Sequence, residues 1–95
     1  MNEPFARIAA ALDRVSSIAE HVPDDVVRLS ARELKRTFAQ HGSVEPAVTR
    51  LRRSVSRLAQ DGGGGAAQQE TVVSQLDSVI AEQLLPELRR VGFDV

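Results

Sequence analysis

The sequence predicts a small all-α protein, either an up-down four-helix bundle or a helical-hairpin oligomer. Prolines and glycines divide the 95 residues into four helix-like segments. Three of these segments space their apolar residues close to a heptad repeat, and few segments alternate apolar and polar residues as strands do. The chain is 42% hydrophobic and only 3% aromatic. We therefore expect one domain overall, with a mostly aliphatic core.

The first helix is expected over about residues 4–21. Pro4 suits the first turn, where its missing N–H costs no hydrogen bond. Pro23 cannot continue the helix, while Asp24 and Asp25 offer a capping oxygen and negative charge to the next one, so we expect a tight corner there. The inward stripe of this helix alternates spacings of three and four residues and comprises Phe5, Ile8, Leu12, Val15, Ala19 and Val22.

The second and third helices are expected over about residues 25–40 and 44–60. Gly42 is expected to cap the end of the second helix. Ser43 is expected to cap the start of the third, with Pro46 in its first turn. The inward residues of the two helices are Val27, Ala31, Leu34 and Phe38, then Val44, Val48, Leu51, Val55 and Leu58.

Four consecutive glycines at 62–65 predict a flexible linker between a three-helix segment, 1–61, and a long amphipathic helix within 66–95. Pro86 is expected to kink this last helix near Glu82. Because a short glycine linker closes a loop at little entropic cost, the last helix is free to pack in cis on the first three or in trans on a second chain.

The apolar face of the last helix is wider than a single groove requires, which favours burial against a second chain. The predicted function is a non-catalytic protein-protein interaction, adaptor or assembly module that binds a protein partner, itself or both, with a homo-oligomer expected. The residues expected to make contact are Val72, Val79, Leu85 and Leu88, with Arg50, Arg53 and Arg57 as polar partners.

Charge is unevenly distributed along the chain. Residues 28–60 carry eight basic and two acidic side chains, whereas the segments before and after them have net charges of −3 and −4. Such a basic block suits a nucleic-acid surface, but it equally suits basic and acidic helices lying side by side. We favour a solvated basic face that pairs with Asp77, Glu82, Glu87 or the acidic residues of a partner.

Residues 42–53 read Gly-Ser-Val-Glu-Pro-Ala-Val-Thr-Arg-Leu-Arg-Arg. This segment resembles the turn and recognition helix of many bacterial helix-turn-helix repressors. The resemblance implies that the helix containing Ala31 and Phe38 lies across the phosphates. A small DNA-binding protein is therefore the alternative function, and the residues that the resemblance would place against DNA are Glu45, Thr49, Arg50 and Arg53.

Several other functions receive no support from the sequence. There is no cysteine, and His21 and His41 have no partners at metal-ligand spacing, so we expect no metal and no other cofactor. The known nucleophile and phosphate-loop motifs are missing, which argues against an enzyme. No apolar run approaches the ~20 residues of a membrane span. We expect no membrane partner and a cytoplasmic location.

Overall fold

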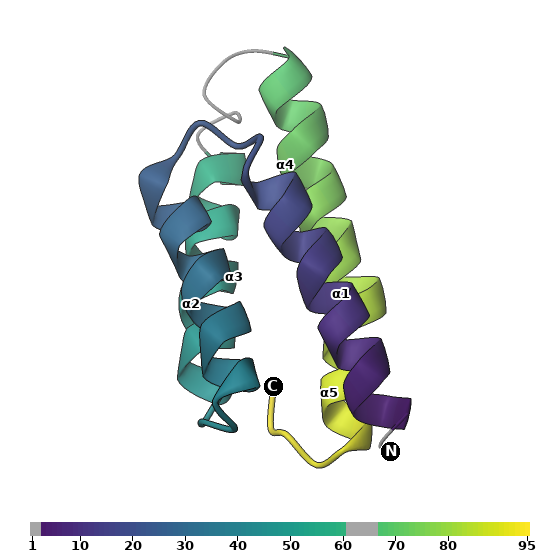
Figure 1. Ribbon diagram of the computed structural model, residues 1–95. Coiled ribbons are helices and arrows are strands. Elements are labelled where there is room, and N and C mark those ends of the chain that lie inside the picture. Colours follow the sequence, from purple (N-terminus) through teal and green to yellow (C-terminus); the bar gives the residue numbers. More distant parts are fainter. Residues whose placement is uncertain (1–2, 61–66) are drawn as a thin grey trace.

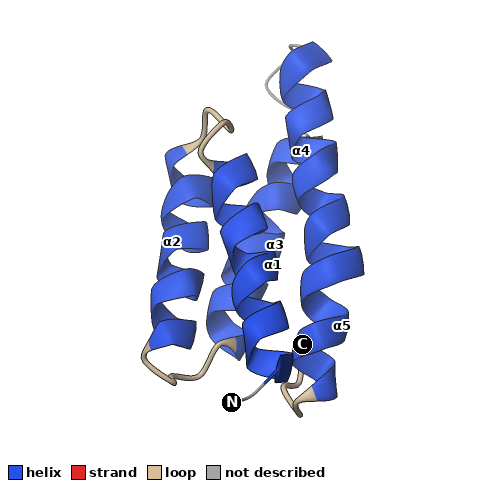
Figure 2. Ribbon diagram, turned by 45° about the vertical axis from the view of Figure 1, so that its right-hand side comes forward, coloured by secondary structure: helices blue, strands red, loops and turns tan. Residues whose placement is uncertain are grey.

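The computed structural model describes residues 3–60 and 67–95, and the side chains of residues 3–60 and 71–95. The described backbone is helical apart from turns and the last residues, as Figure 2 shows. The predicted glycine linker, 62–65, lies outside the described residues. The elements are α1 (Glu3–Ala19), α2 (Asp25–Ala39), α3 (Glu45–Gln60), α4 (Ala67–Val79), a π-helical turn η2 (Ile80–Leu84) and α5 (Leu85–Arg90).

The helices form an up-down bundle within the single chain (Figure 1). Each of α1 and α3 packs against both α2 and α4, and η2 and α5 continue α4 along α1. Neighbours in the sequence are therefore neighbours in space, and contacts between α1 and the C-terminal elements close the ring. This arrangement confirms the predicted all-α four-helix bundle. It follows from short connections, which favour antiparallel packing of successive helices.

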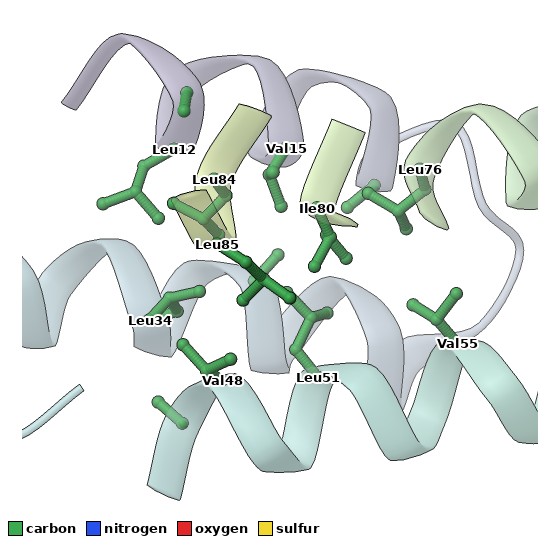
Figure 3. Packing of buried hydrophobic residues seen from close by; sticks show 14 of the residues in the cluster. Leu12, Val15, Leu34, Val48, Leu51, Val55, Leu76, Ile80, Leu84 and Leu85 are labelled. Carbon is green, nitrogen blue, oxygen red and sulfur yellow. The ribbon is translucent and has the colours of Figure 1, made fainter. Parts of the chain in front are cut away.

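The core is aliphatic, as predicted. Side chains from every helix point toward the bundle axis in Figure 3, for example Leu12 from α1, Leu34 from α2 and Leu51 from α3. Phe5, expected in the inward stripe, is instead 39% exposed and rests its ring on Phe38 of α2, with 5.9 Å between ring centroids. The buried hydrophobic residues are Ile8, Ala11, Leu12, Val15, Ala19, Val22, Val27, Ala31, Leu34, Val44, Ala47, Val48, Leu51, Val55, Val73, Leu76, Ile80, Leu84, Leu85 and Leu88.

The predicted corner between the first two helices is present. Helix α1 ends at Ala19, and Val22 is buried just beyond it although it no longer belongs to the helix. The Asp24 side chain caps α2 by accepting a hydrogen bond from the backbone N–H of Val27 at 3.1 Å. Such a cap satisfies one of the four N–H groups that a helix leaves free at its start.

The connection between α2 and α3 differs by one residue from the prediction. His41, not Gly42, adopts the left-handed conformation, with φ of 58°. The N–H of Gly42 bonds to the Thr37 carbonyl at 2.9 Å and that of His41 to the Phe38 carbonyl at 3.1 Å, which is a Schellman motif. Glycine is needed at position 42 because the backbone there lies close to the side chain of Thr37: an added Cβ would lie 3.0 Å from Thr37 Cγ2.

The start of α3 also departs from the prediction. The Ser43 hydroxyl donates a hydrogen bond to the Glu45 carboxylate at 3.2 Å, where we expected it to cap the helix. Val44, the residue before the helix, is fully buried. The chain therefore enters α3 with an apolar side chain directed into the core.

Pro86 is accommodated by the π-helical turn η2. In an α-helix its ring would clash with the carbonyl of Glu82 and its missing N–H would leave that carbonyl unbonded. Instead, the N–H of Leu85 bonds five residues back to Ile80, which is the π-helical pattern. Gln83, within the turn, accepts a hydrogen bond of 2.6 Å from Arg14 of α1. The irregular turn is thus tied to the neighbouring helix.

The chain folds back on itself after α5. Gly92 has φ of 102°, and the N–H of Phe93 bonds to the Leu88 carbonyl at 3.1 Å, again as in a Schellman motif. Phe93 and Val95 then pack against the core. The wide apolar face of the last helix is largely buried within the chain, because α4 packs on both α1 and α3 while η2 and α5 pack on α1.

Replacing His41 with glycine is expected to raise the free energy of unfolding by about 0.5–1 kcal/mol, because a side chain in the left-handed region carries a steric cost that glycine avoids. Urea unfolding measures the change. Gly42→Ala is the matched variant, and it is expected to lower stability because its Cβ meets Thr37. Equal destabilisation by both variants would show that the cap is placed at the wrong residue.

Replacing Leu88 with alanine is expected to lower the free energy of unfolding by about 2–5 kcal/mol, because the side chain is fully buried and its removal leaves a cavity. Val79→Ala, at a half-buried position, is expected to cost less than half as much. Thermal and urea unfolding provide the comparison. If Leu88→Ala weakened only association between chains and left stability unchanged, its burial in the bundle would be disproved.

Candidate interaction surface

The basic side chains on the α1 side of α2 are occupied by acidic residues of α1 and the corner that follows it. The Arg32 guanidinium makes two hydrogen bonds to Glu20, of 2.9 and 3.0 Å. Lys35 lies 2.8 Å from the carboxylate of Asp13. These pairs are exposed, so each contributes at most about 1 kcal/mol to stability. Their positive charges are nevertheless engaged within the chain.

One ion pair links α2 to α3. Arg50 Nη1 lies 2.5 Å from Glu33 Oε2. Arg50 was predicted to contact a partner, or DNA in the alternative function, but its charge is matched within the bundle. The expected pairing of the basic block with Asp77, Glu82 or Glu87 is not found among the described side chains; the ion pairs of the block lead instead to acids of α1, of the corner after it and of α2.

Three arginines of α3 have no ionic partner in the described part of the chain; Arg52, Arg53 and Arg57 are named here the arginine face. They line a shallow hollow of about 450 Å³. The other described residues around this hollow are Thr49, Ser56 and Gln60. The arginine face therefore surrounds an open space with hydrogen-bond donors and no carboxylate from the described lining.

The helical spacing of α3 explains this grouping. At about 100° per residue, the arginine face and its neighbours project away from Leu51, which is fully buried. Arg53 and Arg57 are one turn apart, a spacing at which like charges repel on a helix surface. The sequence pattern identified Arg53 and Arg57 but missed Arg52. The signal was available, since Arg52 lies one turn from Ser56 on the same side of the helix.

The residues implicated by the helix-turn-helix resemblance are not gathered as that motif requires. Thr49 donates a hydrogen bond of 3.0 Å to the Glu45 carbonyl, and Arg50 is paired with α2. Arg53 alone of the four belongs to the arginine face. Helices α2 and α3 lie side by side and run in opposite directions (Figures 1 and 2). The two helices of a helix-turn-helix motif instead cross at roughly 90–120°.

The predicted apolar contact residues do not form one surface with the arginines. Leu85 and Leu88, with 3% and 0% exposure, belong to the core, which corrects their assignment to a contact surface. The reason is that α5, which carries both residues, packs against α1. Val72 and Val79 are half-buried and pack against the core.

Two residues that the sequence analysis did not single out are the large apolar side chains most exposed in the described structure. Val26 is 50% and Leu29 59% exposed, both on α2. Their exposure could have been predicted from the sequence, because both lie outside the inward stripe of α2. Their neighbours on the α1 side are Arg28, paired with Asp25, and Arg32, paired with Glu20.

Among the described residues, no group of three or more His, Cys, Asp or Glu side chains is placed to hold a metal ion. Within the same residues, none of the helices has the length and apolar character needed to cross a membrane. Both histidines follow helix ends, and their side chains are exposed.

Comparison with known proteins gives no match: no family model matches the chain, and neither a curated protein nor a solved structure matches it significantly.

Proposed function

We propose that this chain is a protein-protein interaction module, an adaptor or assembly unit, that binds an acidic protein surface through the arginine face of α3. The observation that carries the proposal is the contrast between the two sides of the basic block. The basic residues facing α1, and Arg50 facing α2, have acidic partners within the chain. The arginine face has none among the described residues and surrounds an open hollow.

The physical cost of this arrangement supports a binding role. Each pair of like charges one turn apart on a helix lowers the stability of that helix by about 0.2–0.5 kcal/mol. Arg53 and Arg57 have this spacing, so an anionic partner would relieve their repulsion. Guanidinium groups are weakly hydrated and bind carboxylates with two parallel hydrogen bonds, and arginine is enriched at protein interfaces.

A protein partner accounts for these observations better than duplex DNA does. The chain as a whole has a net charge of −1, whereas nucleic-acid-binding domains are commonly strongly basic. The side-by-side packing of α2 and α3 also presents no separate recognition helix to a major groove. DNA binding is retained as an outcome of the test.

The test is a fluorescence-anisotropy titration with two probes at low salt: a labelled polyglutamate peptide and a labelled duplex DNA of similar length. We expect the peptide to bind, and binding to weaken as salt rises. The triple change Arg52→Glu, Arg53→Glu, Arg57→Glu is expected to abolish it. The control Arg7→Glu, Arg89→Glu, Arg90→Glu changes the net charge equally on α1 and α5, and is expected to retain most of the affinity.

Two results would contradict the proposal. Equal loss of binding in both triple variants would assign the affinity to net charge and not to the arginine face. Binding of the duplex with no binding of the peptide would favour the DNA-binding alternative. Light scattering at two concentrations separately tests whether the acidic partner is a second copy, because self-association would raise the mass above the 10.3 kDa of one chain.

A single neutral substitution provides a second prediction. Arg53→Gln is expected to leave the free energy of unfolding unchanged or to raise it by a few tenths of a kcal/mol, because it removes repulsion with Arg57. The same substitution is expected to weaken binding of the acidic peptide. Urea unfolding and anisotropy on one preparation measure both effects. A clear loss of stability would instead assign Arg53 a structural role.

A further inference from the structure

The Glu33–Arg50 ion pair shows that these two residues lie opposite each other on α2 and α3. Because the helices are antiparallel, one step forward on α2 matches one step back on α3, and each step is about 1.5 Å. Val26 is therefore level with Arg57, and Leu29 is level with Ser54, one residue from Arg53. The helix bounds agree with this alignment, since it places Ala39, the last residue of α2, level with Val44, the residue before α3.

Helical spacing places these residues on the same edge. On α2, Val26 and Leu29 lie on the side of Glu33, seven and four residues away from it. On α3, Arg53 and Arg57 lie three and seven residues from Arg50, on the side of that residue. The boundary between the two helices thus carries exposed apolar side chains on α2 and unpaired guanidinium groups on α3. We name Val26, Leu29, Arg53 and Arg57 the α2–α3 seam.

Unpaired positive charge is also found next to the seam on α2, but only on one side of Leu29. Arg36 follows Leu29 by two helical turns, is exposed, and has no ionic partner among the described residues. On the other side of Leu29, the charges of Arg28 and Arg32 are already matched by Asp25 and Glu20. The unpaired positive charges therefore lie on the α3 side of Val26 and Leu29 and, at Arg36, beyond their C-terminal end.

From these placements we infer that the α2–α3 seam binds an acidic amphipathic helix of a partner protein, with apolar side chains of that helix on Val26 and Leu29 and its carboxylates on Arg53 and Arg57. The inference rests on the proposed function and names the partner class. The seam together with Arg36 beyond it spans about 15 Å along α2, or roughly three turns of helix. A helix read through a few apolar anchors with flanking charges is a common mode of recognition.

The same placements argue against two other occupants. A second copy bound symmetrically would bring the arginines of both seams together, and like charges would repel. A phosphate backbone would pair with the arginines but would leave Val26 and Leu29 without an apolar contact. Only an occupant that is both acidic and apolar matches the whole seam.

The experiment uses three fluorescein-labelled helical peptides of about eighteen residues, long enough to be partly helical alone. The first is alanine-based, with two leucines three residues apart and glutamates one turn away on either side. In the second the leucines are replaced by glutamine, and in the third the glutamates are replaced by lysine. We expect the first to bind about tenfold more tightly than the second, from burial of its apolar side chains. The third is expected not to bind.

Substitutions in the full chain locate the site. The double change Val26→Gln, Leu29→Gln is expected to weaken the leucine peptide about tenfold and to leave the glutamine peptide unaffected. Ala9→Gln, at an exposed position of α1, is the control and is expected to change neither affinity. Circular dichroism and urea unfolding check that the double variant remains folded.

The outcomes separate this inference from the proposed function. Equal binding of the leucine and glutamine peptides, both lost in the arginine triple variant, would overturn the seam and leave the arginine face as a general acidic-protein site. Failure of both peptides to bind would overturn both proposals. Unchanged binding of the leucine peptide to the Val26→Gln, Leu29→Gln variant would place the apolar contact elsewhere and also overturn the seam.

Discussion

The structure depends on one constraint, which is that each helix has a single apolar stripe and must bury it against two neighbours at once. No pair of helices can cover these stripes, because the stripe of α1 faces both α2 and α4 and that of α3 does the same. Burial of apolar surface is the dominant favourable contribution to folding. The closed ring of four helices is the smallest arrangement that satisfies all four stripes, and it then determines which surface charges can meet. Arg32 finds Glu20 and Arg50 finds Glu33 because the ring brings these edges together.

The sequence predicted those features of the fold that local spacing controls. The apolar spacing identified the buried side of the first three helices, and Asp24, one of the two aspartates expected to supply the capping oxygen, caps α2. The left-handed residue was placed one position late, at Gly42, because glycine is the usual choice and the close contact with Thr37 is invisible before folding. Pro86 predicted an irregularity in the last helix near Glu82, but a proline in the sequence does not distinguish a kink from a π-helical turn. The choice between them depends on packing against α1.

The candidate surface was less predictable, because it depends on which charges remain after the helices have paired. Spacing alone placed Arg50, Arg53 and Arg57 on one side of α3, and it could not reveal that Glu33 would engage the first of them. The apolar width of the last helix suggested a partner, but most of this face is buried within the chain against α1 and α3. Leu85 and Leu88 are therefore explained by the chain itself. Val26 and Leu29, which looked unremarkable in the sequence, become noticeable only as apolar side chains that nothing in the bundle covers.

The order of neighbours in the ring also has a kinetic consequence. Most contacts join helices that follow one another along the chain: α1 with α2, α2 with α3, and α3 with α4. The contacts of α1 with α4, η2 and α5 instead join segments that are separated by most of the length of the chain. Chains rich in local contacts fold fast, because little loop entropy is lost before each contact forms. Docking of the C-terminal elements on α1 is the most entropically demanding step. Amide hydrogens of η2, where the helical pattern is already interrupted, should then be among the first in the helices to exchange with solvent.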